Sequence, residues 1–121
     1  MNQNRIVTPP DPLKLFDDEG RLDVDRMAEL MEISRADLAE VFGLTASQLR
    51  PDRISPNTEE RVGKLASALN HVAETFQGDI KKTRAWIKIP NMNFGGSSPR
   101  DLILRGKYKK VLAFIMSAKE R

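Results

Sequence analysis

Few side chains in this 121-residue chain are placed to do covalent or metal chemistry. The only histidine, His71, has no second histidine and no obvious carboxylate partner at ligand spacing, and the sequence contains no cysteine. A structural zinc site needs about four such ligands. There is no thiol nucleophile, no Ser-His-Asp order and no GxxxxGK[ST] phosphate loop around Gly95-Gly96. We therefore expect a protein that is not an enzyme and that holds no metal or other cofactor.

The charged side chains are divided unevenly along the chain. Residues 1–60 carry 7 Lys or Arg against 13 Asp or Glu, a net charge of −6, whereas residues 61–121 carry 13 against 4, a net charge of +9. A basic half of this kind can bind nucleic-acid phosphates or an acidic protein partner, and it can also be an ordinary solvated face. These three interpretations stay open on charge alone.

The most specific stretch of the sequence is Trp86–Pro99, which we expect to connect two helices. Pro90 ends the helix that carries Trp86, because proline disfavours the α region in the residue before it. Gly95-Gly96 allows backbone angles that a side chain would block, so residues 91–97 are predicted to form a loop. A purely structural alternative is a tight interhelical connection in which Trp86 is a core anchor.

The helix after this loop has a well-marked start. Ser98 is the expected N-cap, Pro99 occupies the first helical position and Asp101 the third, which predicts a helix over 99–105 that stops at Gly106. A final amphipathic helix follows. Its inward face is predicted to contain Tyr108, Val111, Leu112 and Ile115, and its positive fringe Lys107, Lys109, Lys110 and Lys119.

Three short capped segments precede residue 56. Asp23, Ser34 and Thr45 are the expected N-caps, while Gly43 ends the second segment and Pro51 stops the third. This is the order of elements in a helix-turn-helix unit, although capped short helices also occur in any small bundle. The side chains expected to point inward are Val24, Met27, Leu30, Met31, Leu38, Ala39 and Phe42.

The longest helix is predicted over Asn57–Phe76, with Asn57 as its N-cap and Gly78 as its stop signal. Its apolar side chains recur at three- and four-residue steps and form one stripe, which is either core or a dimer seam. They are Val62, Leu65, Ala66, Leu69, Val72, Ala73 and Phe76. At the amino end, Leu13, Leu15 and Phe16 are expected to dock on the body, and residues 17–20 to form a turn.

The pattern W-I-x-x-P-N-x-x-F-G-G-x-x-P that begins at Trp86, together with Arg61 upstream, resembles the toxin-binding domain of Xre/MbcA/ParS-type antitoxins. The spacing of Ala39, Gly43 and Leu44 is similar to that of the Xre helix-turn-helix. The resemblance extends from about residue 33 to about residue 115. It implies an all-α protein with an amino-terminal arm (1–20), a helix-turn-helix lobe (21–56) and a toxin-binding helical domain (57–121).

The resemblance also implies a function. Such a protein is the antitoxin of a type II toxin-antitoxin pair, a homodimer that neutralises an NAD-degrading RES-domain toxin and represses its own operon. By this resemblance the toxin-binding residues are Trp86, Pro90, Asn91, Phe94, Gly95, Gly96 and Pro99. The basic residues that we expect to face acidic groups of the toxin are Lys107, Lys110, Lys119 and Arg121. The segment from Thr45 becomes the recognition helix, and the DNA-binding residues are Arg35, Ser47, Gln48, Arg50 and Arg53.

Two other functions fit the same sequence, a stand-alone helix-turn-helix regulator and an adaptor that joins proteins without binding DNA. No apolar run reaches membrane-spanning length, and the amino terminus lacks the apolar region of a signal peptide. We therefore expect a cytoplasmic protein that does not enter the membrane.

Overall fold

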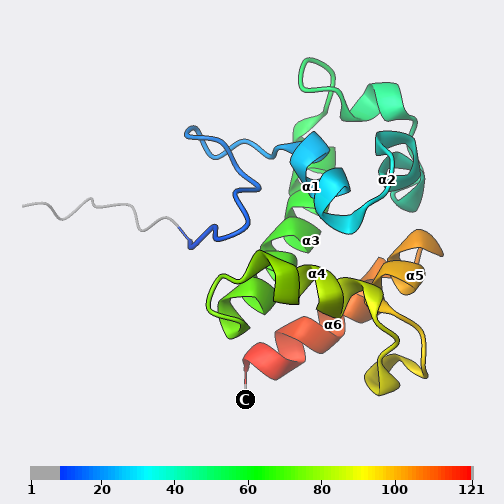
Figure 1. The fold of residues 1–121 in the computed structure, drawn as a ribbon. Helices are drawn as coiled ribbons and strands as arrows, with labels where there is room; N and C mark the ends of the chain where they lie inside the picture. The colour runs from blue at the N-terminus through cyan, green and yellow to red at the C-terminus, as the bar shows by residue number, and fades with distance from the viewer. Residues whose placement is uncertain (1–8, 121) are drawn as a thin grey trace, which may run out of the picture.

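The computed structural model describes residues 9–120, which form six α-helices joined by short connections (Figure 1). The predicted all-α class is confirmed. Two short 3₁₀ turns, η1 (Ala46–Leu49) and η2 (Met92–Phe94), lie in the connections. The α-helices are α1 (Val24–Met31), α2 (Arg35–Val41), α3 (Pro56–Thr75), α4 (Ile80–Lys88), α5 (Pro99–Leu104) and α6 (Tyr108–Lys119).

Helix α3 runs through the middle of the molecule, with α1 and α2 beside its upper part and α4 and α6 beside its lower part (Figure 1). The predicted apolar stripe faces the core, since Val62, Leu65 and Leu69 are fully buried. Gly78 ends the helix as predicted: its φ is +82°, and its backbone N–H donates to the Ala73 carbonyl at 2.7 Å.

The predicted start of α3 is wrong by two residues. The N-cap is Ser55, whose Oγ accepts a hydrogen bond from the Thr58 backbone N–H at 3.1 Å, and Pro56 is the first helical residue. Proline suits this position because its φ is already helical and its missing N–H would have no partner there. Asn57 therefore lies inside the first turn and caps nothing.

The other predicted caps are confirmed. Asp23, Ser34 and Ser98 each accept a hydrogen bond from the backbone N–H three residues later, and Thr45 is the N-cap of η1. Asp79 caps α4 in the same way as the first three. The predicted third helix is only the four-residue turn η1, because Pro51 forces the preceding residue, Arg50, into an extended conformation.

The amino-terminal arm is held against α3 through one buried amide. Asn70 Oδ1 accepts a hydrogen bond from the Leu13 N–H at 3.0 Å, and Asn70 Nδ2 donates to Asp11 Oδ1 at 2.8 Å. The Asp11 carboxylate also accepts hydrogen bonds from the Leu15 and Phe16 backbone N–H groups. Leu13 and Leu15 are buried and Phe16 packs against the core, so the predicted docking of the arm is confirmed.

Side chains from residues 21–56 and 57–121 share one core. The ring of Phe42, at the end of α2, packs 4.6 Å from that of Tyr108 on α6, centroid to centroid. Arg61 on α3 places its guanidinium 5.6 Å above the Phe42 ring and donates to the Phe42 carbonyl at 3.5 Å. The division of the chain into two functional parts stays a prediction, and any such parts are in direct contact.

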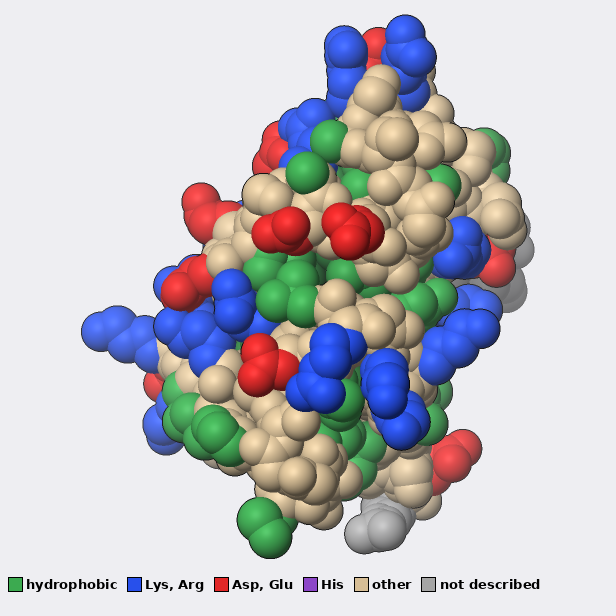
Figure 2. All heavy atoms as spheres, turned by 90° about the vertical axis from the view of Figure 1, so that its right-hand side faces the viewer, with side chains coloured by type: hydrophobic (Ala, Val, Ile, Leu, Met, Phe, Trp, Pro, Cys, Tyr) green, Lys and Arg blue, Asp and Glu red, His purple; other side chains and the backbone are tan. Residues whose placement is uncertain are grey.

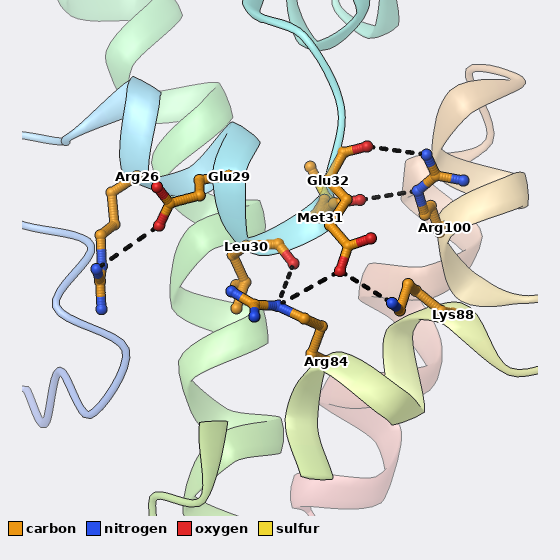
Figure 3. A network of polar contacts seen from close by, with 8 residues as sticks. All are labelled: Arg26, Glu29, Leu30, Met31, Glu32, Arg84, Lys88 and Arg100. Atoms are coloured by element: carbon orange, nitrogen blue, oxygen red, sulfur yellow. Dashed lines mark hydrogen bonds and ion pairs between the residues drawn. The ribbon is translucent and has the colours of Figure 1, made fainter. Parts of the chain in front are cut away.

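Three cations from α4 and α5 converge on the carboxyl end of α1 (Figure 3). Arg100 donates to the Met31 carbonyl at 2.7 Å and to the Glu32 carbonyl at 3.0 Å. The Glu32 carboxylate lies 2.9 Å from Lys88 Nζ and 3.8 Å from Arg84 Nε. The hydrogen bond from Lys88 is the main cause of the lowered pKa of Glu32, and the charges of Lys88, Arg84 and Arg100 add to it. Positive charge at a helix carboxyl terminus also complements the helix dipole.

Candidate partner-binding surface

The loop between α4 and α5 is closed by Asn91. Its backbone N–H donates to the Ser97 carbonyl at 3.0 Å, and its carbonyl accepts from the Gly96 N–H at 3.1 Å. These bonds require a tight reversal of the chain, in which Gly95 and Gly96 have φ values of +65° and +89°. The prediction that this glycine pair serves a special backbone conformation is confirmed.

An aromatic cluster holds the loop against two helices. The Phe94 ring, from η2, meets the Trp86 ring of α4 edge-on at 6.4 Å between centroids. Its other side meets Phe114 of α6, also edge-on, at 5.1 Å. Edge-to-face pairs at these distances are favourable beyond the area that they bury. The loop is therefore a supported surface, positioned by α4 on one side and α6 on the other.

Two large apolar side chains of this loop face solvent. Ile89 is 57% exposed and Met92 is 89% exposed. The loop lies at the lower right of Figure 1, and Figure 2 shows the molecule from that side. Hydrophobic side chains reach the surface at the lower end of this face (Figure 2). Beside Ile89 is a shallow hollow of about 300 Å³, lined by Phe76, Lys82, Ala85, Trp86, Ile89, Pro90 and Asn91. We call Ile89, Met92 and this hollow the apolar loop surface.

The structure brings together only part of the predicted toxin-binding set. Trp86, Pro90, Asn91, Phe94, Gly95 and Gly96 all belong to the loop or its support. Pro99 is buried as the first residue of α5, so it shapes the backbone and offers no contact surface. Lys107 is the N-cap of α6 and Lys119 is the last residue of this 12-residue helix, so the two lie about 18 Å apart along its axis. Lys110 is exposed on α6, and Arg121 lies outside the described residues.

Sequence reasoning missed Ile89, Met92 and Lys82. Ile89 and Met92 occupy unspecified positions of the pattern that begins at Trp86, so the pattern gave no reason to single them out. The available signal was the presence of bulky apolar residues on both sides of Pro90, in a segment where a loop was expected. An apolar residue in a loop can turn inward or outward, and its exposure depends on the tertiary structure.

The predicted DNA-binding residues are partly occupied by internal contacts. Arg35 forms a two-pronged pair with the Asp25 carboxylate, with both oxygens 2.7 Å from Nη2. Gln48 Oε1 accepts from the Thr45 N–H at 2.9 Å, and Arg50 lies 3.4 Å from Asp52. Ser47 and Arg53 are exposed near η1, at the top of the molecule in Figure 1. A four-residue 3₁₀ turn is only about 8 Å long, short for a helix that must follow the major groove.

Besides the hollow at Ile89, a larger depression of about 690 Å³ lies between α3 and α6. Its lining is mostly apolar and includes the apolar or small residues Gly63, Ala68, Leu112 and Met116 together with Glu60, Lys64, His71 and Lys119. His71 Nδ1 is 3.4 Å from Glu74 Oε1, so the expectation that His71 has no carboxylate partner is wrong. Among residues 9–120, no cluster of three or more His, Cys, Asp or Glu side chains could hold a metal ion.

Comparison of the chain with protein-family models, curated proteins and solved structures found no match. In the part of the chain that the structure describes, no helix is both long and apolar enough to cross a membrane. The case for any function therefore rests on the surfaces described above and on the resemblance in the sequence.

The glycine pair gives a direct test of the loop geometry. We expect Gly96→Val to lower the free energy of unfolding by about 1–3 kcal/mol, because a β-branched residue is strained at a φ of +89°. Steric overlap is not the cause, since a Cβ at this position has no atom within 4 Å. Urea unfolding measures the effect, and Asn93→Val, which introduces the same residue at an exposed position of the same loop, is the control. Equal stability of the Gly96 variant and the wild type would contradict a strained backbone.

Proposed function

We propose that this protein is the antitoxin of a type II toxin-antitoxin pair and that it captures a RES-type NAD-degrading toxin with the apolar loop surface. The observation that carries the proposal is the exposure of Ile89 and Met92 on a loop supported by Trp86, Phe94 and Phe114. Exposed apolar side chains on a preorganised loop favour association, because few groups must be ordered when the partner binds. The resemblance at Trp86–Pro99 supplies the class of partner.

The neutralisation mechanism that we propose is steric. The loop and α6 cover the nucleotide cleft of the toxin, so that NAD does not enter. Burial of Ile89 and Met92 supplies most of the affinity, and the lysines of α6 speed the encounter with acidic groups of the toxin.

Expression of the full chain together with a RES-type toxin tests this proposal. We expect the two proteins to purify as a complex, growth to be restored and cellular NAD to be preserved. An inactive toxin variant allows the complex to be measured without selection. A folded chain that neither binds the toxin nor preserves NAD would overturn the antitoxin assignment and leave the adaptor as the alternative.

Autorepression through operator DNA is a second proposal, supported by the exposure of Ser47, Arg50 and Arg53 at one end of the molecule. Its contacts would be mainly to phosphates. Each phosphate contact contributes about one unit to the slope of log affinity against log salt concentration.

The double substitution Arg50→Ala and Arg53→Ala should therefore weaken operator binding and reduce this slope by about 2. Fluorescence anisotropy over a salt series measures both quantities. The matched control is Lys81→Ala with Lys109→Ala, which removes the same charge from exposed positions on α4 and α6. If both double variants change the slope equally, a general basic field binds DNA and the assignment of the residues around η1 is wrong.

We also propose a homodimer, as the resemblance implies, formed through the depression between α3 and α6. Its mostly apolar lining also includes both acidic and basic side chains, a combination that suits pairing with a second copy around a two-fold axis. Light scattering after size exclusion measures the mass of the free chain. A monomer at all accessible concentrations would remove this part of the proposal.

A further inference from the structure

The hollow on α4 combines apolar walls with a single cation. Phe76, Trp86 and Ile89 form much of its wall, and Lys82 is the only charged residue that lines it. Lys82 precedes Trp86 by four residues on the same helix, so the two side chains are neighbours on one face. A volume of about 300 Å³ is at the lower limit of small-molecule pockets and is better suited to one bulky side chain than to a cofactor.

Lys82 has no ionic partner among residues 9–120. The nearest acidic residue in the sequence, Asp79, is the N-cap of α4, and its carboxylate accepts a hydrogen bond from the Lys82 backbone N–H at 3.1 Å. By contrast, Arg84 and Lys88 pair with Glu32. The helix therefore directs two cations to the protein's own carboxylate and leaves the one beside the hollow free.

Unpaired lysines also occur elsewhere on α4 and on α6. Within the described part of the chain, the lysines of α4 and α6 that form no ion pair are Lys81, Lys82, Lys109, Lys110 and Lys119. This excess of unpaired positive charge on the two helices that support the loop favours an acidic protein segment as the partner. Nucleic-acid backbone binding would require several cations lining the hollow, and it has one.

We infer that this hollow receives a bulky apolar side chain, of the leucine or phenylalanine type, from an acidic segment of the partner, and that a neighbouring Asp or Glu carboxylate pairs with Lys82. This inference rests on the proposed function, because it takes the segment that enters the hollow to belong to the toxin that the apolar loop surface binds. It specifies a local pattern, a large apolar residue beside an acidic one.

Trp86 makes the hollow directly observable, because it is the only tryptophan in the chain and lies in its wall. The probes are three capped peptides, Glu-Leu-Leu-Glu, Gln-Leu-Leu-Gln and Glu-Ala-Ala-Glu, titrated into the full chain while tryptophan emission is recorded. We expect the first to bind and to shift the emission. The second should bind about two- to fivefold more weakly, the range of a solvent-exposed ion pair, and the third should give no shift.

Two variants separate the ion pair from general charge. Lys82→Gln should remove the difference between the Glu-Leu-Leu-Glu and Gln-Leu-Leu-Gln peptides, whereas Lys81→Gln, the same change on an exposed neighbour that does not line the hollow, should preserve it. Absence of binding by all peptides, or equal effects of the two variants, would overturn the inference. A stronger emission change with a thymidine oligonucleotide than with Glu-Leu-Leu-Glu would also overturn it, in favour of nucleic acid.

The toxin assay and the peptide titration test the proposed function and this inference separately. A chain that neutralises the RES-type toxin but fails the peptide titration refutes the inference alone. A chain that binds Glu-Leu-Leu-Glu through Lys82 but does not bind the toxin supports the chemistry of the hollow and refutes the antitoxin assignment.

Discussion

The double substitution Ile89→Asp and Met92→Asp should abolish toxin neutralisation while leaving the fold intact. Both side chains are mostly exposed, so the free chain loses little buried area. In the complex, burial of each would contribute about 1.5–3 kcal/mol, which predicts a loss of affinity of roughly 10²- to 10⁴-fold. Burying two unpaired carboxylates would increase the loss. Calorimetry with an inactive toxin measures the affinity, and growth rescue measures the consequence.

Leu104→Asp is the matched control. Leu104 is 37% exposed but belongs to α5, outside the apolar loop surface, so this change should leave neutralisation unaltered. Ile89→Ala with Met92→Ala removes the same apolar groups without adding charge and should give an intermediate loss. Full protection by the double Asp variant, with a thermal transition equal to that of the wild type, would exclude this surface as the toxin-binding site.

The helices could be predicted because their ends depend on local chemistry. Ser98-Pro99 identified the start of α5 correctly, since an N-cap hydroxyl followed by proline at the first helical position involves only neighbouring residues. The same pair occurs at Ser55-Pro56, and the prediction chose Asn57 because that residue also favours N-caps. That error was avoidable. The reduction of the third segment to a 3₁₀ turn is likewise a local consequence of Pro51.

The candidate site could be predicted only in part, because two of its properties depend on the tertiary structure. The pattern located the loop and its glycine pair, but no pattern shows that Phe94 meets Phe114 or that Ile89 and Met92 remain outside. Which cations of α4 form ion pairs also depends on the tertiary structure. Lys82 and Lys88 are equivalent in the sequence, and they differ because Glu32, 56 residues before Lys88, lies beside only one of them.

The contact between α1 and α5 holds the apolar loop surface in a fixed position relative to the rest of the fold. Helix α5 follows the loop directly, and Arg100, in its first turn, donates to two carbonyls at the end of α1 (Figure 3). The loop is therefore attached at one end through α4 to Glu32 and at the other through Arg100 to the same short segment. Loss of this attachment should affect stability first and partner binding second.

Arg100→Met should lower the free energy of unfolding by about 2–3 kcal/mol. Methionine keeps most of the apolar stem but removes the charged donors, so the Met31 and Glu32 carbonyls lose hydrogen bonds that are worth about 1.5–3 kcal/mol each when charge-assisted. Two such bonds would sum to about 3–6 kcal/mol, and the partial exposure of Arg100 lowers the expected loss to about 2–3 kcal/mol. Urea unfolding gives the value, and Arg105→Met, which removes only a bond to the Ser97 hydroxyl, is the control with a smaller expected loss.

The pH dependence separates this contact from the neighbouring ion pairs. Because the pKa of folded Glu32 lies below its value in the unfolded chain, the carboxylate stabilises the fold fully above the unfolded pKa, and this contribution is lost as the pH falls through the folded pKa. The destabilisation caused by Glu32→Gln should therefore vanish in acid. The loss caused by Arg100→Met should persist there, since backbone carbonyls and arginine do not titrate in that range. If the Arg100 deficit also vanished in acid, its stabilising role would be charge pairing with Glu32 and not the capping of α1.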